Sequence, residues 1–465
     1  MKILLVGRWG KAHAVGKALV SDGVELFSFM DKKNPGIANI SSDFHIGNLK
    51  DKYEILDYAK KKEVDLVFIS PEMTLKTGVT DLLDKEGIPN VGPSKFCSKL
   101  ESDKLFVRDF LKEHDLDMSP DYRAFHDMDS ALSYIDEIDN DFAVKPAGVT
   151  ERDGVKVIGI QLENKQDAKD YVREIFEKNI GELPYILIED KIEGEEFTIQ
   201  AFVDGKSVVP MPVVRDYKLL KDGNQGLNTP GMGSYTEKNH LLPFLDRVTF
   251  NQGLELMQKT IDIFREEYGE HYKGILSGQF MLTMDGLKLI EFNVRAGDSE
   301  ILNIVPIMKT PMKDILWAIS KNELGDLNIE FENKATVCKY LVPPGFPTPK
   351  KNVEVDFDVL EVENDVRKMY QSCFEVDKSM YQPSPRTFAV TGVGNTVSEA
   401  KKNCEEGLEM FDGDGLSYRK DIGSRKLRES YLWTLEIPEE KTLKTSTNLL
   451  EDAKDWSSTR STSTK

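Results

Sequence analysis

The sequence contains little of what marks a disulfide-rich, zinc-binding or membrane-spanning protein. Its 465 residues include only four cysteines, Cys97, Cys338, Cys373 and Cys404, which are scattered and form no CxxC pair. Their spacing excludes a disulfide framework and argues against a zinc site, so we expect buried, reduced thiols. No apolar run approaches the roughly 20 residues that a membrane helix needs, and the apolar run at the N-terminus is too short for a signal peptide. We therefore expect a soluble, cytoplasmic protein.

The chain also lacks the excess of basic residues that favours a polyanionic partner. It has 80 acidic against 61 basic residues, which gives a formal net charge of −19. Most of such a surface would repel a phosphate backbone or an anionic membrane. We expect neither nucleic acid nor membrane as a partner, only a local basic pocket for a small phosphorylated metabolite, and a monomer or dimer.

What the sequence does contain at its start is a regular alternation of short apolar strands and amphipathic helices. The segments KILLVG, VELFSFM, DLVFIS and IPNVG alternate with helical segments such as HAVGKALVSDG and KYEILDYAKKK. This alternation predicts right-handed βαβ units and a parallel sheet, as in half of a dinucleotide-binding fold. The first turn, GRWGKAH, opens a helix after a strand, where anions bind, but it does not match GxGxxG.

The rest of the chain predicts α+β structure with less regular spacing. A compact α+β unit is followed by a Gly/Asn/Pro loop DGNQGLNTPGMGSY, a long helix LDRVTFNQGLELMQKTIDIFREEYG and a hairpin GQFMLTMDGLKLIEFN. Strands and one helix, TVSEAKKNCEEGLEMF, predict a smaller domain over residues 334–432. The Ser/Thr/Lys-rich segment 433–465 is expected to be disordered.

The hairpin ends in two oxygen ligands. Glu291 and Asn293 project from the same face of an otherwise apolar strand. We favour a three-residue loop MDG, with Gly286 in the left-handed position and Gln279 opposite Glu291, over a two-residue loop that would place Phe280 there. This oxygen cluster suits Mg²⁺ or Mn²⁺ with retained waters, bridging substrate phosphates. A solvated strand end has the same spacing, so both interpretations stay open at this point.

The stretch YILIEDKIEGEEF predicts a hinge between two strands. One strand ends at Glu189, and the next begins near Glu196, with Gly194 in the connector. Backbone groups at Asp190 and Ile192 could read the edge of a purine, and Glu196 could accept hydrogen bonds from both ribose hydroxyls. An acidic surface loop has the same pattern, and the pattern on its own favours the surface loop over the hinge.

Two lysines lie where an anion could stabilise them. Lys145 lies inside the apolar strand FAVKPAG, where burying an ammonium group is costly without a partner. Lys104, on the helix SDKLFVRDF, would alone pass as a solvated residue. After Lys145 the loop PAGVTERDGV could cover phosphates because Gly148 and Gly154 allow a tight turn, although a phosphate cradle usually contains more glycine.

In this order, the helix lysine, strand lysine, loop, acidic hinge and carboxylate–asparagine hairpin resemble the ATP-grasp ligases. The segments NPGIA, GIPNVGPSKFCSKLESDK, GLNTPGMGSY, KGILSGQFML, IEFNVRAGDSE and YRKDIGSRKL are similar to the phosphoribosylamine glycine ligase family, up to about residue 428. The resemblance implies an α/β and α+β multidomain protein. Its parts would be an N-terminal parallel-sheet domain at 1–98, an ATP-grasp domain at 99–333 with a lid at about 122–192, and a C-terminal domain at 334–432.

The resemblance also implies a reaction and a site. ATP would phosphorylate glycine, and 5-phosphoribosylamine would attack the glycyl phosphate, giving glycinamide ribonucleotide, ADP and phosphate in de novo purine synthesis. The implied nucleotide contacts are Lys104, Lys145, Glu189, Asp190, Ile192 and Glu196; the ligands of Mg²⁺ or Mn²⁺ are Glu291 and Asn293; the substrate residues are Asp216, Gly231, Met232, Gly233 and Asp298; and the catalytic residues are Arg295, Lys145 and Asp298.

Several loops depart from the pattern of that family. The ATP loop has Glu151, Arg152 and Asp153 where the family usually has Gly-Gly-Lys, and RWGKA, DYKL, LNTPG and RAGDSE also differ. Acidic side chains beside a triphosphate predict a high Michaelis constant for ATP. Because the changes fall in loops that would hold phosphates and substrates, the alternative is a diverged ATP-grasp paralogue. Such a protein would bind nucleotide but ligate another amine, or serve a non-catalytic regulatory role.

Overall fold

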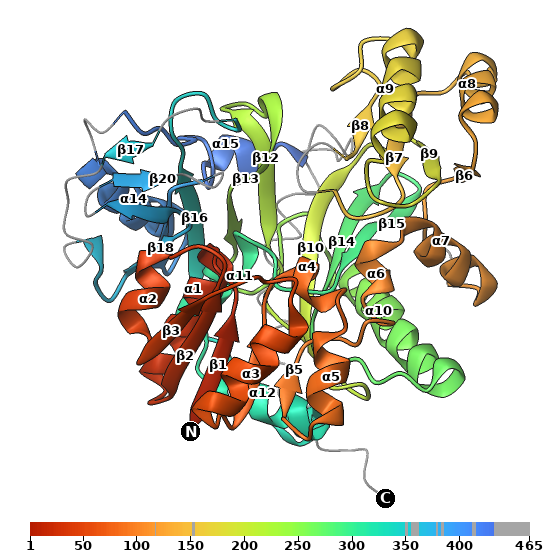
Figure 1. The fold of residues 1–465 in the computed structure, drawn as a ribbon. Helices are drawn as coiled ribbons and strands as arrows, with labels where there is room; N and C mark the ends of the chain where they lie inside the picture. Colours follow the sequence, from red (N-terminus) through yellow and green to blue (C-terminus); the bar gives the residue numbers. More distant parts are fainter. Residues whose placement is uncertain are drawn as a thin grey trace, which may run out of the picture.

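The structure is a computed structural model that describes residues 1–116, 118–150, 154–348, 352–354, 362–377, 380–382, 386–411 and 415–431. The charged residues of the ATP loop, 151–153, and the segment 433–465 lie outside these ranges, so the predictions about them stay predictions. Figure 1 shows the N-terminal part in red, the segment predicted to be a lid (about 122–192) in orange and yellow, a central part in green, and the C-terminal part in blue.

The N-terminal part is a parallel sheet covered by helices, as predicted. Its strands lie in the order β3-β2-β1-β4-β5, and every neighbouring pair is parallel. The edge strand β3 was not predicted, because only one of its four residues is even partly buried and its sequence shows no apolar pattern. The elements are β1 (Lys2–Val6), α1 (Gly10–Ser21), β2 (Glu25–Met30), α2 (Pro35–Ile40), β3 (Asp43–Ile46), α3 (Lys52–Lys62), β4 (Leu66–Ile69), α4 (Glu72–Leu75), α5 (Val79–Lys85) and β5 (Asn90–Val91).

The lid has a sheet and a hydrophobic core of its own. Its strands lie in the order β6-β9-β7-β8 and pair antiparallel. Its two helices contribute Ile135 and Val172 to a core that is separate from the main one. Figure 1 shows it standing away from the rest of the molecule. The elements leading into it and forming it are α6 (Lys99–Ser102), α7 (Lys104–Glu113), β6 (Tyr122–Phe125), α8 (Met128–Glu137), β7 (Phe142–Pro146), β8 (Lys156–Val157), α9 (Lys165–Lys178) and β9 (Ile186–Asp190).

The central part is an antiparallel sheet, in the order β11-β10-β14-β15, that packs against the long helix α10. This sheet carries the hairpin with Glu291 and Asn293. The elements are β10 (Glu195–Val203), β11 (Val208–Pro210), α10 (Arg247–Tyr268), β14 (Gly274–Thr283), β15 (Gly286–Asn293), α11 (Glu300–Ile304), η1 (Val305–Ile307), α12 (Met312–Lys321) and η2 (Leu324–Asp326).

The hairpin β14–β15 contains the predicted pair of Gln279 and Glu291, but its turn is shorter than predicted and a bulge makes up the difference. Gln279 lies opposite Glu291, as predicted, but Thr283 pairs with Gly286, so the turn has two residues rather than three. The register shifts after the pair of Phe280 with Leu289. A β-bulge at Ile290 therefore provides the extra residue that the sequence-based prediction had placed in the loop.

The segment predicted as the loop DGNQGLNTPGMGSY is instead mostly strand, so that prediction is wrong. Strand β13 (Gln225–Thr236) pairs with β12 (Arg215–Lys221) on one side and with β16 (Ala335–Leu341) on the other. Gly233 has a φ of +146°, and a Cβ there would lie 2.2 Å from the carbonyl oxygen of Cys338. The glycines that suggested a loop therefore allow two strands to approach closely.

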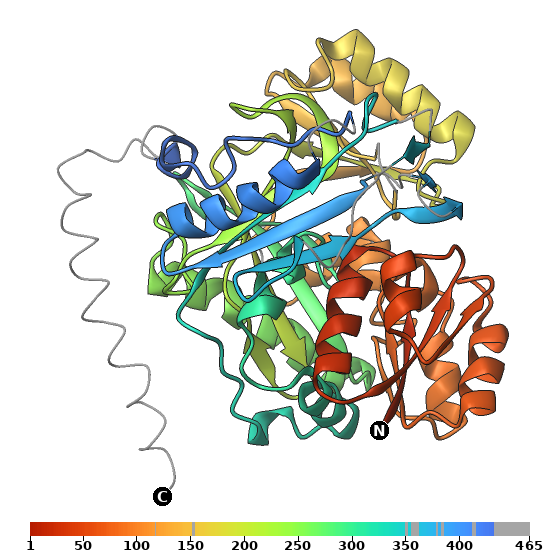
Figure 2. The ribbon, with the colours of Figure 1, turned by 90° about the vertical axis from the view of Figure 1, so that its left-hand side faces the viewer.

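Strands from both sides of the proposed boundary at residue 333 join in one sheet, in the order β12-β13-β16-β21-β18. Figure 2 shows the blue helix α14 lying along this sheet, and α14 contacts β21 and β16. The C-terminal part also contains a small sheet with the strand order β17-β20-β19. The elements are β12 (Arg215–Lys221), β13 (Gln225–Thr236), β16 (Ala335–Leu341), β17 (Val353–Glu354), β18 (Arg367–Gln371), β19 (Phe374–Asp377), β20 (Met380–Gln382), β21 (Phe388–Gly394), α14 (Val397–Leu408), η3 (Glu409–Phe411) and α15 (Arg425–Arg428).

Two further predictions from composition can be compared with the structure. All four cysteines are buried and free, as predicted. Among the described residues, no helix combines the length and the apolar character that crossing a membrane requires.

Candidate active site

The end of β15 lies where the lid, the N-terminal part and the hairpin β12–β13 meet. The Glu291 carboxylate interacts electrostatically with Lys104 from α7, Lys145 from β7 and Lys218 from β12. Arg295, just beyond β15, forms ion pairs with two carboxylates from residues 72 and 101. The structure thus brings together four residues that the sequence predicted for one site, Lys104, Lys145, Glu291 and Arg295, from elements far apart in the chain, and adds Lys218, which was not predicted.

Glu291 is poised to be an ionised ligand. Burial opposes its ionisation, but the ammonium groups of Lys104, Lys218 and Lys145 lower its pKa below the usual value. Asn293 donates from Nδ2 to Glu291 Oε1 at 3.4 Å. Within the described ranges, no group of three or more acidic, histidine or cysteine side chains is placed to hold a metal. A cation here would take a carboxylate and an amide oxygen, with water and phosphate oxygens completing its shell, and this donor set suits Mg²⁺.

Lys104 is fixed at the first turn of α7 by the end of β7. Asp103 caps the helix by accepting from the amide of Phe106, and the Lys104 amide donates to the carbonyl oxygen of Ala147 at 2.8 Å. Lys104 Nζ donates to the carbonyl oxygen of Gly148 at 2.9 Å. Burial lowers the pKa of Lys104, and its attraction to Glu291 opposes that shift. An added anion would therefore stabilise the charged form of this lysine.

Lys145 and Glu189 form a buried ion pair. Lys145 Nζ lies 2.5 Å from Glu189 Oε2, and Arg108 donates to both carboxylate oxygens of Glu189. The Glu189 carboxylate, which was predicted to contact adenosine, is thus engaged by two cations of the protein itself. Sequence reasoning missed Arg108, although it lies four residues after Lys104 and therefore on the same helix face.

The other hinge residues lie at or just after the end of β9. Asp190 is the last residue of β9, and its amide donates to the carbonyl oxygen of Asp121 at 2.9 Å. Ile192 lies in the connector and is partly exposed. Glu196, in β10, accepts from Lys218 Nζ at 2.6 Å and from the side-chain amide of Gln279.

The Asp216 carboxylate is enclosed by the protein, and few neighbouring groups stabilise its negative charge. Its Oδ1 is buried, and the part of the chain that the structure describes gives it no hydrogen-bond partner. Burial raises the pKa of Asp216 to about 7; the Lys218 ammonium opposes the rise, and the Glu300 and Glu196 carboxylates add to it. This carboxyl group can therefore exchange a proton near neutral pH.

Asp298 connects four segments of the chain. Its carboxylate accepts from the amide of Lys11 at 3.3 Å and from the hydroxyl of Tyr340, and it lies 3.2 Å from Arg386 Nη2. Arg386 Nη1 also donates to the carbonyl oxygens of residues 230, 231 and 298, each at 3.1 Å. Sequence reasoning missed Arg386 and Tyr340 because no local pattern links them to Asp298.

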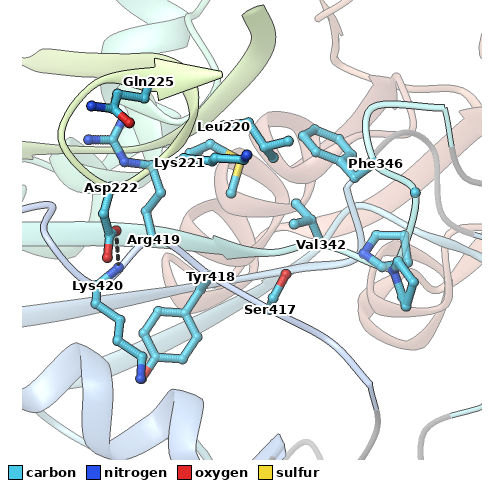
Figure 3. Close-up of a pocket in the computed structure, with 14 residues that line it drawn as sticks. Leu220, Lys221, Asp222, Gln225, Val342, Phe346, Ser417, Tyr418, Arg419 and Lys420 are labelled. Atoms are coloured by element: carbon cyan, nitrogen blue, oxygen red, sulfur yellow. Dashed lines mark hydrogen bonds between the residues drawn. The ribbon is translucent and has the colours of Figure 1, made fainter. Parts of the chain in front are cut away.

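The three substrate residues predicted in β13 do not share an environment. Gly231 has a φ of +117°, and a Cβ there would contact the Arg386 guanidinium at 3.3 Å. Met232 is buried and lines a separate cavity of about 470 Å³ next to the hairpin β12–β13. Figure 3 shows this cavity with Leu220, Phe346 and other lining residues, which include none of the lysines around Glu291.

Arg295 is held in a network of alternating charges. Its Nε lies 3.3 Å from Glu72 Oε2 and its Nη2 3.1 Å from Glu101 Oε1, while Nη2 also donates to Asn293 Oδ1 at 3.2 Å. Lys11 Nζ lies 3.6 Å from the same Glu72 oxygen. Burial and the nearby Arg295 charge lower the pKa of Lys11 to about 8. Sequence reasoning missed Glu72 and Glu101, which lie in short helices with no distinctive motif.

The raised pKa of Asp216 predicts a pH-dependent gain in stability for Asp216→Asn. Because the folded-state pKa lies near 7, above the reference value of 3.8, the native state binds more protons between these values and loses stability as the pH rises through this window. Above pH 7, where asparagine removes this cost, we expect Asp216→Asn to be more stable than the wild type by about 1–3 kcal/mol. Denaturant unfolding at pH 4.5 and pH 8 measures the difference.

Asp285→Asn is the matched control for this stability experiment, because Asp285 is exposed in the β14–β15 turn. It should give the same small difference from the wild type at both pH values. An Asp216→Asn protein that gains no more stability at pH 8 than at pH 4.5 would show that Asp216 titrates as an ordinary carboxylate.

Comparisons with known proteins show which family the chain is similar to. Three domain families match the chain: the N domain of phosphoribosylglycinamide synthetase at residues 1–101, its ATP-grasp (A) domain at 102–301 and its C domain at 336–425. A phosphoribosylamine–glycine ligase of Methanococcus maripaludis is 42% identical over 434 residues, covering 92% of this chain and 97% of that relative. The corresponding protein of Methanopyrus kandleri is 38% identical over 440 residues, covering 92% and 97%.

Solved structures share the fold. The phosphoribosylamine–glycine ligase of Thermotoga maritima has a TM-score of 0.75 and 23% identity, covering 91% of this chain and all of that one. The biotin carboxylase domain of the Hydrogenobacter thermophilus 2-oxoglutarate carboxylase, in complex with MgADP and bicarbonate, has a TM-score of 0.70 and 15% identity, covering 93% and 97%.

The fold and the lysine–carboxylate cluster define an ATP-grasp ligase, an enzyme that uses ATP. The chain belongs to the phosphoribosylamine–glycine ligase family. The resemblance, fold class and ATP-dependent ligase activity predicted from the sequence are thereby confirmed.

Proposed function

We propose that this protein joins glycine to 5-phosphoribosylamine with ATP, giving glycinamide ribonucleotide, ADP and phosphate through a glycyl phosphate intermediate. Family membership supports the substrates. The observation that carries the proposal is the ring of Lys104, Lys145 and Lys218 around Glu291. Such a ring can hold a triphosphate beside a carboxylate, and Arg295 lies next to it.

On the ATP side, the protein mainly neutralises and aligns charge. Lys104 and Lys145 would contact phosphate oxygens, and Glu196 would accept from the ribose hydroxyls while Lys218 holds it in place. Asp190 and Ile192 would offer backbone groups to the adenine. Phosphoryl transfer needs little covalent work from a protein, because alignment and electrostatic stabilisation provide most of the rate enhancement.

The residues at the end of β15 fit a divalent metal. Glu291 and Asn293 would hold Mg²⁺ or Mn²⁺, which when bound would neutralise the phosphate charge. The chemistry of these two donors supports a metal. Three nearby ammonium groups favour the ionised form of Glu291, and Asn293 adds an amide oxygen.

On the acceptor side, Asp216 and Arg295 have complementary roles. The Arg295 guanidinium would stabilise the oxygens of the transferring phosphoryl group, since Glu72 and Glu101 already fix its orientation. Asp216, with a pKa of about 7, can accept the proton that the attacking amine loses. The backbone of Gly231 and Gly233 would border the amine site. Asp298, bound by Arg386 and Tyr340, would hold the segment after β15 against α1.

The proposal is tested by measuring ADP release from purified protein with each substrate omitted in turn. We expect release to require ATP, glycine and freshly prepared 5-phosphoribosylamine together, with glycinamide ribonucleotide as the product. ADP release that is independent of 5-phosphoribosylamine, or that requires another amine, would contradict the assignment of the acceptor and favour the diverged paralogue.

The hinge assignment predicts that Glu196→Gln weakens ATP binding by about tenfold, because a neutral amide accepts ribose hydroxyls less strongly than a carboxylate. Isothermal titration with a non-hydrolysable ATP analogue measures this change. Glu193→Gln is the control, since Glu193 lies in the same connector with its side chain 78% exposed. Equal affinities for Glu196→Gln and the wild type would remove Glu196 from the ribose site.

A further inference from the structure

Arg108 is a buried arginine whose guanidinium joins two strands that carry the site. It is 3% exposed. Its Nε donates to Glu189 Oε1 at 3.0 Å and its Nη2 to Glu189 Oε2 at 3.2 Å. The same Nη2 donates to the carbonyl oxygen of Ile290 at 2.7 Å. One side chain on α7 is therefore bound to the last lid strand, β9, and to β15.

Each of the two acceptors of Arg108 adjoins a group that is proposed to face the nucleotide or its metal. Ile290 is the bulged residue of β15, and it immediately precedes Glu291. Glu189 is 1% exposed, and its Oε2 lies 2.5 Å from Lys145 Nζ. Burial opposes the ionisation of Glu189, but Lys145 and Arg108 lower its pKa to about 2. The carboxylate is thus a permanent anion between two cations.

We propose that Arg108 is a positioning residue of the nucleotide site. It fixes the position of the Lys145 ammonium through Glu189 and the position of the Glu291 carboxylate through the Ile290 carbonyl. This inference rests on the proposed nucleotide role of Lys145. It gives Glu189 a task other than contact with adenosine: the carboxylate orients Lys145. It also gives the β-bulge a function, because the bulge turns the Ile290 carbonyl towards the arginine.

The geometry requires the planar fork of arginine. Two nitrogens bind one carboxylate in parallel, and one of them also binds a carbonyl oxygen on another strand. A lysine has a single nitrogen at the end of a flexible chain and cannot hold all three acceptors in one plane. Arg108→Lys therefore keeps the buried positive charge but no longer aligns the Glu189 carboxylate with the Ile290 carbonyl.

The experiment measures the affinity of the protein for an ATP analogue by titration, together with kcat and the Michaelis constants, for Arg108→Lys, Arg108→Met and Glu189→Gln. We expect the dissociation constant for the analogue to rise about tenfold in Arg108→Lys and by about 10- to 100-fold in Arg108→Met, because a small misplacement of aligned groups is costly. The Michaelis constant for glycine should change by less than about threefold, since Arg108 touches no residue proposed for the acceptor.

A double-mutant cycle with Lys145→Met separates positioning from general destabilisation. If Arg108 acts through Lys145, adding Arg108→Met to Lys145→Met should weaken binding by only about twofold more, whereas independent effects would multiply. Arg123→Met is the matched control, because Arg123 lies on the neighbouring strand β6, is exposed and stacks on Tyr134. It should bind the analogue like the wild type.

Two results would overturn the inference. One is wild-type affinity for the analogue in Arg108→Lys, and the other is a fully multiplicative double mutant. If Arg108→Met does not fold, Arg108→Lys and Glu189→Gln decide the outcome, with Glu189→Gln expected to weaken binding at least fivefold. The titration contains no glycine or amine, so a failure of the proposed acceptor chemistry would appear only in the turnover assay.

Discussion

Replacing Glu291 by alanine is expected to lower kcat by at least about 10³-fold while leaving the fold intact. Glu291 is the only carboxylate that the proposed metal site contains, so its loss would remove the metal's charged ligand. Glu291 is partly exposed at the end of β15, and truncation would open a wet gap rather than a core cavity. We expect the free energy of unfolding to change by less than about 2 kcal/mol.

The Glu291 experiment also separates catalysis from nucleotide binding. Without the carboxylate, Lys104, Lys145 and Lys218 lose their shared counter-charge, so metal-free ATP should bind at least as tightly as it does to the wild type. ADP release at ordinary Mg²⁺ concentration and titration with ATP in the presence of a chelator measure the two effects. Met284→Ala is the control, because Met284 is 67% exposed in the same hairpin. Wild-type ADP release by Glu291→Ala would remove this residue from the metal site.

The sequence was sufficient to predict several of the elements that carry the site, but not β12, β13 or the short helix α4. Alternation of strands and helices predicted the parallel sheet around β1, and period-two spacing placed Glu291 and Asn293 on one face of β15. Lys145 stood out because an ammonium group inside an apolar strand requires an anion. These inferences depend on local periodicity and on the chemistry of single side chains, which one sequence contains.

The partners of those residues could not be predicted, because they come from distant segments. Glu72, Glu101 and Arg108 lie in helices whose local patterns are ordinary, and they meet Arg295 and Glu189 only when the domains pack. The bulge at Ile290 is a similar case: its carbonyl accepts a hydrogen bond from Arg108, 182 residues away in the chain, and the sequence of the hairpin does not contain this partner. Turn chemistry alone favoured a three-residue loop.

The strand β13 shows how packing overrides propensity. Its glycine, asparagine and proline residues predicted a loop, since these residues favour turns. The structure pairs the segment with β16 so closely that a Cβ at Gly233 would overlap the Cys338 carbonyl oxygen. The glycines are therefore needed for a strand against another backbone, a requirement that appears only once the partner strand is known.

Arg295→Lys is expected to lower kcat by about 10²- to 10³-fold, the loss that follows removal of one aligned donor from a transition state. Arginine presents its guanidinium to Glu72, Glu101 and Asn293 at once, and lysine cannot keep these three contacts while facing a phosphoryl group. The dissociation constant for ATP should change by less than about threefold, because Lys104 and Lys145, and not Arg295, are the residues proposed to hold the triphosphate. Steady-state kinetics and titration with an ATP analogue measure the two quantities.

The lysine variant is preferable to an apolar one, because it keeps a cation beside the two carboxylates. Burial opposes the ionisation of Glu72, and Lys11 and Arg295 lower its pKa to about 2. Removing the arginine charge altogether would therefore leave buried carboxylates with too little compensation and would mix folding with catalysis. Arg425→Lys, with its side chain 80% exposed on α15, should retain wild-type activity. If Arg295→Lys raised the Michaelis constant for glycine with kcat unchanged, Arg295 would bind the ground-state carboxylate rather than the transferring phosphoryl group.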